Sequence, residues 1–162
     1  APMLRAQGHD VTVIDYPYMD NGGDLAATVR AINAGNYDIS ISVHCDSSDS
    51  PSSRGAHVCH HRTYHDDGTC TDSVQGKDLA EAIAGPLCKL LPGRADHVQA
   101  RPDRSCTPPK SSLYVLRKTN PPAVLVECGF ISNAGDTDLM KNNPAAIARA
   151  IAWGVNTYTQ RK

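Results

Sequence analysis

The segment AVLVECGF at residues 123–130 constrains the fold more than any other part of the sequence. It is a short, continuous apolar run, and such runs are typical of strands that are covered on both faces. Three other segments have strand-like patterns: residues 11–16 (VTVIDY), 37–45 (YDISISVHC) and 55–61 (GAHVCHH). The sequence therefore predicts a central sheet whose last strand is deeply buried.

Three segments with helical spacing separate or follow these strands. They span residues 24–33, 73–91 and 143–158. Ser73 is placed to cap the second helix, and Pro86 to kink it. Asn143 can cap the third helix, and Pro144 suits its first turn. Residues 92–112, rich in Pro and Ser, are expected to form a loop. Strands that alternate with helices predict an α/β fold with the sheet between two helical layers.

The length and charge of the chain limit its class and its partners. Its 162 residues carry 16 basic and 17 acidic side chains, for a net charge of −1, which suits one globular domain over residues 1–162. This near-neutral balance favours neither a nucleic acid nor an anionic membrane as partner. No apolar run approaches the ~20 residues of a membrane-spanning helix, so no membrane span is predicted.

Six cysteines leave the redox state of the chain open. None has the C-x-x-C spacing of a zinc knuckle or a redox pair, and an even count is compatible with free thiols or with one or two disulfides. Cys45 and Cys128 directly follow two polar residues at strand ends. Strand alternation predicts that both thiols point away from those residues and are buried.

Those two polar residues, His44 and Glu127, are the candidates for chemistry. Each closes a predicted strand, and ligand sites of α/β sheets gather at the carboxyl ends of strands. A histidine nitrogen suits zinc, and a carboxylate beside a metal-bound water can take its proton during hydrolysis. On spacing alone, we favour a structural interpretation of such residues, with hydrogen bonds to a loop or helix end.

Longer motifs around these residues carry a family resemblance. SVHCDSS at residues 42–48, Gly55, the segment LYVLRKTNPPAVLVECGFISNAGDTDLM at 113–140 and the closing helix resemble the zinc-dependent N-acetylmuramoyl-L-alanine amidases of bacteria and their phages. The resemblance extends over nearly the whole chain. It implies a mixed, mostly parallel sheet with helices on both faces, in a protein that acts on the cell-wall side or is secreted, including release at phage lysis.

The resemblance also implies an activity and roles for the two candidates. The activity is hydrolysis of the amide that joins N-acetylmuramic acid to the first L-alanine of the stem peptide, with peptidoglycan as partner and Zn²⁺ as cofactor. His44 matches a zinc-ligand histidine, and Glu127 matches the catalytic glutamate. An inactive module of the same fold that binds peptidoglycan or a partner is the alternative.

The chain departs from the family at its N-terminal end. The family supplies two further zinc ligands there, a histidine after the first strand and a glutamate on the following helix. Residues 1–14 resemble the end of that helix and the strand after it, so both ligands are expected before Ala1, and the domain is expected to be N-terminally incomplete. His9 is interpreted as a loop residue.

A second group of potential ligands lies in the segment 55–61. In a strand, His57, Cys59 and His61 share one face, as metal ligands can. Solvent-facing polar residues on an edge strand explain the same pattern, and we favour that interpretation.

Three polar residues near the last strand have mainly structural interpretations. Arg117 is expected to be a surface arginine that pairs with a nearby Asp, with contact to substrate as the alternative. Asn133 and Asp136 are expected to cap the short helix that follows them.

Overall fold

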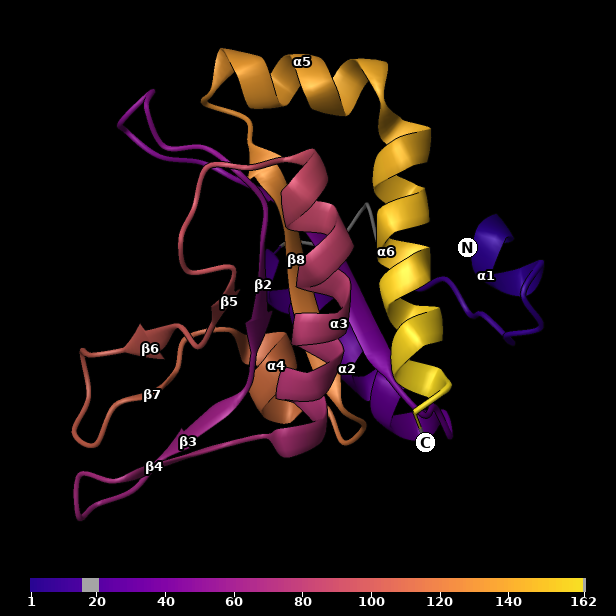
Figure 1. Ribbon diagram of the computed structural model, residues 1–162. Coiled ribbons are helices and arrows are strands. Elements are labelled where there is room, and N and C mark those ends of the chain that lie inside the picture. Colours follow the sequence, from indigo (N-terminus) through magenta and orange to yellow (C-terminus); the bar gives the residue numbers. More distant parts are fainter. Residues whose placement is uncertain (16–20, 162) are drawn as a thin grey trace.

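The computed structural model describes residues 1–15 and 21–161, which form a sheet between two helical layers (Figure 1). The central sheet has the order β1-β8-β2-β5: Ser40–Asp46, Ala123–Phe130, His57–His60 and Val98–Gln99. β1 pairs with β8 and β2 with β5 in parallel, whereas β8 and β2 are antiparallel. The prediction of a mixed, mostly parallel sheet with helices on both faces is confirmed.

The apolar run that predicted a covered strand forms β8, and all eight of its residues are buried. Its side chains alternate between two hydrophobic clusters. Val124, Val126 and Cys128 belong to the first cluster, whereas Ala123 and Leu125 belong to the second. By the same alternation, Glu127 lies on the face of Leu125.

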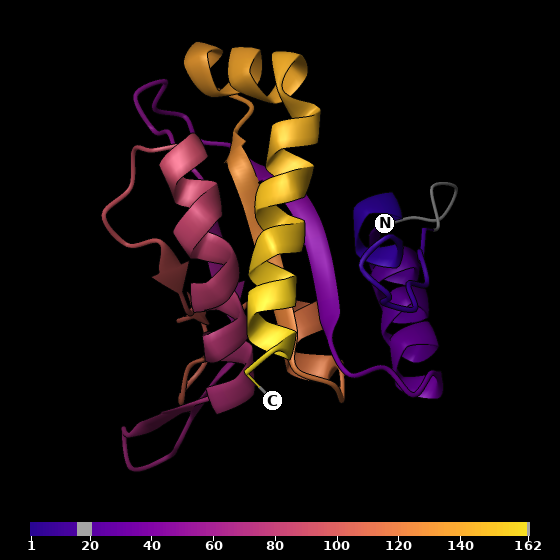
Figure 2. The same cartoon turned by 45° about the vertical axis from the view of Figure 1, so that its right-hand side comes forward.

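Helices cover both faces of this sheet (Figures 1 and 2). The first cluster is closed by α3 (Val74–Leu90) and α6 (Pro144–Thr159), and the second by α2 (Asn21–Ala34) and α4 (Tyr114–Lys118). α5 (Ala134–Asn142) crosses one end of the sheet, and α1 (Pro2–Arg5) lies beside α6. None of the helices in the described part of the chain is long and apolar enough to cross a membrane.

Local signals in the sequence account for several helix boundaries. The Ser73 hydroxyl accepts a hydrogen bond from the Gly76 amide at the start of α3, as predicted. Asn133 caps α5 through the Asp136 amide, and Pro144 opens α6. Asn143 precedes α6 without a side-chain cap. α3 and α6 approach closely at Gly154, where a Cβ would lie 2.4 Å from the Ile83 Cα.

Two sequence-based predictions about strands are wrong. Residues 11–15 form no strand, and Tyr16 lies outside the described residues. The segment 55–61 does not supply an edge strand: β2 lies between β8 and β5, and its four residues are buried. The partner that covers β2 is β5, a two-residue strand within the segment 92–112, where the sequence predicted only a loop.

Four further short strands form two hairpins outside the central sheet. β3 (Arg62–Tyr64) pairs with β4 (Cys70–Asp72), and β6 (Pro102–Asp103) pairs with β7 (Lys110–Ser111). All six cysteines lie in the described residues, and each is a free thiol. Cys128 is buried as predicted, but Cys45 is exposed, because β1 stands at the edge of the sheet as the structure describes it.

Candidate functional site

Strand register brings three side chains into one row across the sheet. His44 on β1 and His57 on β2 both have Glu127 on β8 as their Cα partner, from opposite sides. Paired residues on neighbouring strands point to the same face. The structure therefore places both predicted site residues side by side, and it adds His57 beyond them.

His44 and Glu127 differ in their surroundings. His44 is exposed and lines a cleft of about 330 Å³ between β1, α2 and the segment 12–15. Its Nε2 lies 2.7 Å from the Ser42 hydroxyl. Glu127 is only 5% exposed, and its Oε2 atom has no hydrogen-bond partner.

Asp46 completes a compact cluster with Glu127 and His57. A register shift between His44 and Asp46 sets Asp46 opposite Phe130. One potential ligand atom from each of Asp46, His57 and Glu127 lies within 4.8 Å of the others. The cluster therefore joins two carboxylates and an imidazole from three adjacent strands.

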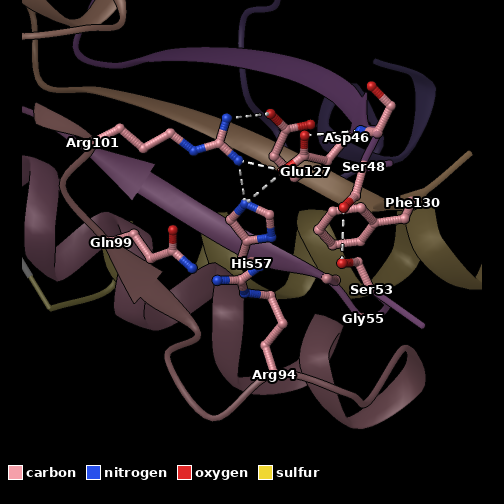
Figure 3. Close-up of polar contacts among 12 residues, drawn as sticks. Asp46, Ser48, Ser53, Gly55, His57, Arg94, Gln99, Arg101, Glu127 and Phe130 are labelled. Carbon is pink, nitrogen blue, oxygen red and sulfur yellow. Dashed lines mark hydrogen bonds and ion pairs between the residues drawn. The ribbon is translucent and has the colours of Figure 1, made fainter. Parts of the chain in front are cut away.

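Arg101 places a guanidinium inside this cluster (Figure 3). Its Nη2 donates to Asp46 Oδ2 and lies 2.7 Å from His57 Nε2. Its Nη1 lies 3.6 Å from Glu127 Oε1. The positive charge offsets the repulsion of two carboxylates that are held close together.

The contact with Arg101 determines the protonation state of the His57 imidazole. A guanidinium has only donors, so His57 Nε2 must accept, and the ring is neutral with its proton on Nδ1. Burial, then the charges of Arg101 and Arg94, lowers the pKa of His57 to about 4, against the opposing effect of Asp46. His57 is fully buried, so this neutral state is coupled to folding.

The stability of the protein is therefore expected to fall as the pH falls from about 6.5 to 4. In that window the unfolded chain binds a proton at His57 and the folded chain does not, so acid favours unfolding, by at most about 3 kcal/mol. Urea unfolding at pH 7 and pH 4.5 measures the loss. His57→Gln should remove this part of the loss, whereas His65→Gln, at an exposed position, should keep it. An equal pH dependence in both variants would contradict the assignment.

Glu127 has the properties of a proton acceptor. Burial and, second, the nearby Asp46 raise the pKa of its carboxyl, whereas Arg101 lowers it. A raised pKa brings a carboxylate nearer the range in which it accepts and returns a proton at neutral pH.

The described residues fit a zinc ion only in part. His44 is an exposed nitrogen donor on the rim of a cleft, which suits a ligand, but no group of three potential ligands in the described ranges includes it. Asp46, His57 and Glu127 form such a group, and zinc accepts these donor types. The guanidinium of Arg101 sits among them, and its charge opposes a second cation. The set of His57, Cys59 and His61 considered above does not form a group of this kind among the residues described.

Sequence reasoning did not identify Asp46 or Arg101 as members of the site. Asp46 lies two residues beyond His44 but reaches the cluster only through the register shift, which has no sequence signature here. Arg101 belongs to the segment predicted as a loop. Arg117 donates to the Ser111 carbonyl and lies over the Tyr114 ring, so a contact with the protein backbone takes the place of the expected Asp partner.

This three-layer α/β fold, with a buried carboxylate within its interior strand β8, defines the class of the protein. Residues 1–157 match the Amidase_3 family, described as N-acetylmuramoyl-L-alanine amidase. N-acetylmuramoyl-L-alanine amidase LytC of Bacillus subtilis (strain 168) is 32% identical over 136 residues, which cover 83% of this chain and 24% of that protein. The chain belongs to the N-acetylmuramoyl-L-alanine amidase family.

Solved structures show the same fold. The catalytic domain of the CD27L endolysin targeting Clostridia Difficile superposes with a TM-score of 0.74 and 26% identity, over 96% of this chain and 78% of that one. The amidase Ami1 of Mycobacterium smegmatis has a TM-score of 0.75 at 20% identity, over 99% of this chain and 74% of that one. The chain spans about a quarter of the length of LytC.

Proposed function

We propose that this domain hydrolyses the amide bond between N-acetylmuramic acid and L-alanine in peptidoglycan, in a zinc-dependent reaction on the cell-wall side of the membrane. The observation that carries the proposal is Glu127, a buried carboxylate at the fifth of the eight positions of β8, in a chain of this amidase family. A strand covered on both faces holds such a group rigidly, and proton transfer requires hydrogen-bond reach.

The proposed roles follow from the chemistry of each residue. His44 contributes one zinc ligand at the rim of the cleft. When bound, zinc polarises the scissile carbonyl and lowers the pKa of water toward ~7. Glu127 accepts the proton of the attacking water and delivers it to the departing amine of L-alanine. Oε1 faces Arg101.

The alternative is a module of the same fold that binds peptidoglycan without cleaving it. Such a module would need no zinc site, and among the described residues the group of three potential ligands does not include His44. The two functions differ in their products, because a binding module releases nothing from the cell wall.

An assay on purified peptidoglycan separates the two functions. The full-length protein with zinc should release soluble stem peptides whose new N-terminal residue is alanine, without new reducing sugar ends. A chelator should stop the release, and added zinc should restore it. Binding to peptidoglycan with no release of alanine amines, in the presence of zinc, would support the binding module and contradict the amidase.

Substitution of His44 tests the proposed metal ligand. In the full-length protein, His44→Ala should weaken zinc binding by at least about 100-fold, since even residues that only orient a ligand contribute 10–100-fold. Metal content after dialysis against a zinc buffer measures the change. His65→Ala, at an exposed position on the β3–β4 hairpin, is the matched control and should keep its zinc. Equal zinc content in the two variants would exclude His44 as a ligand.

A further inference from the structure

Arg101 is the one side chain of the site that contacts all three members of the carboxylate and imidazole cluster. It meets Asp46 on β1, Glu127 on β8 and His57 on β2. In Figure 3 its side chain extends toward these groups. Arg101 itself follows β5, so the contact ties a fourth strand to the cluster.

The backbone of Arg101 is held in place on its other side. Its carbonyl accepts hydrogen bonds from the Ser112 amide, at 2.8 Å, and from the Ser112 hydroxyl, at 3.0 Å. Ser112 directly follows β7, whose neighbour β6 begins one residue after Arg101. An arginine that is held at its backbone and at its guanidinium has little conformational freedom. This suits a residue that orients another group.

The contacts of the Arg101 guanidinium give the two carboxylate oxygens of Glu127 different surroundings. Nη2 is occupied by Asp46 and His57, and Nη1 faces Glu127 Oε1. Oε2 of Glu127 is left without a partner. The ion pair at Oε1 restrains the orientation of the carboxylate.

We propose that Arg101 is a positioning residue for Glu127: with Asp46 and His57 it fixes the orientation of the carboxylate. The inference rests on the proposed amidase function and deepens it. Arg101 acts through Glu127 and does not itself touch the substrate, because its Nη atoms are directed to protein groups.

Kinetics of Arg101 variants in the zinc-loaded, full-length protein test this role. Arg101→Ala should lower kcat roughly 100-fold, the scale of a misplaced catalytic group, with KM changed less than about 3-fold. Arg101→Lys retains the positive charge but lacks the planar guanidinium. Its kcat should therefore lie between that of the wild type and that of Arg101→Ala. Guanidinium ion at a non-denaturing concentration should partly restore the kcat of Arg101→Ala and leave the kcat of the wild type unchanged.

Arg104→Ala is the matched control, because it removes an exposed arginine three residues along the same segment. It should keep wild-type kcat and KM. A double-mutant cycle of Arg101→Gln with Asp46→Asn should be non-additive in kcat, since both changes release the same carboxylate.

Three outcomes would overturn the inference. A raised KM with unchanged kcat would make Arg101 a substrate-binding residue. If Arg101→Ala had the kcat and KM of the wild type, Arg101 would have no role in positioning Glu127. A second tightly bound zinc in wild-type protein, lost with Asp46→Asn, would make the cluster a metal site. In each case an active wild-type enzyme keeps the proposed function, whereas an inactive wild-type enzyme would contradict that function first.

Discussion

Glu127→Gln is expected to lower the rate of amide hydrolysis about 1,000-fold, within the range that a positioned acid or base contributes. Glutamine has nearly the shape of glutamate, so the buried site stays filled, but its amide cannot accept the proton of the attacking water. The charge that repels Asp46 also disappears, so the fold should be retained. The effect is measured as the rate at which the full-length protein exposes new N-terminal alanine amino groups in peptidoglycan. Variant and wild type are compared at equal zinc content.

Glu81 provides the control for this substitution, because it is the only other glutamate of the chain and lies exposed on α3. Glu81→Gln should retain full activity. Glu127→Asp keeps a carboxylate but withdraws it by one methylene, and it should have an intermediate rate. Activity of Glu127→Gln within 10-fold of the wild type would remove Glu127 from its proposed role.

Asp136→Ala is expected to reduce the free energy of unfolding by about 3 kcal/mol. Asp136 is fully buried, and its Oδ2 accepts hydrogen bonds from the amides of Gly55, at 2.7 Å, and Phe130, at 2.9 Å. Loss of the carboxylate leaves both buried amides without that acceptor. Gly129 belongs to the same arrangement: its φ is +119°, and a Cβ there would lie 3.1 Å from Asp136 Oδ2.

Asp136 ties together the ends of β8 and the approach to β2, the two strands that present Glu127 and His57. The stability loss should therefore be accompanied by weaker activity in the remaining folded protein. Asp138→Ala, at an exposed position on the same helix, should change stability by less than about 0.5 kcal/mol. Urea unfolding of both variants at pH 7 measures the difference, and equal stabilities would show that the two amides find other partners.

The covered strand could be predicted because its signal is local. Residues 123–130 are apolar throughout, and β8 occupies the predicted range. Ser73, Asn133 and Pro144 likewise act within one helical turn of the boundaries they set. β5 was missed because two residues carry no periodicity, and its pairing with β2 is a contact between segments about 40 residues apart.

The sequence by itself determined the α/β fold class, the family, and the candidates His44 and Glu127. These are consequences of local pattern and of continuous motifs. Only the tertiary structure decided that His57 is buried in an interior strand beside Glu127, and that Asp46 and Arg101 join it. The physical reason is that strand register and the reach of a long side chain depend on distant pairings, which no single segment of the chain encodes.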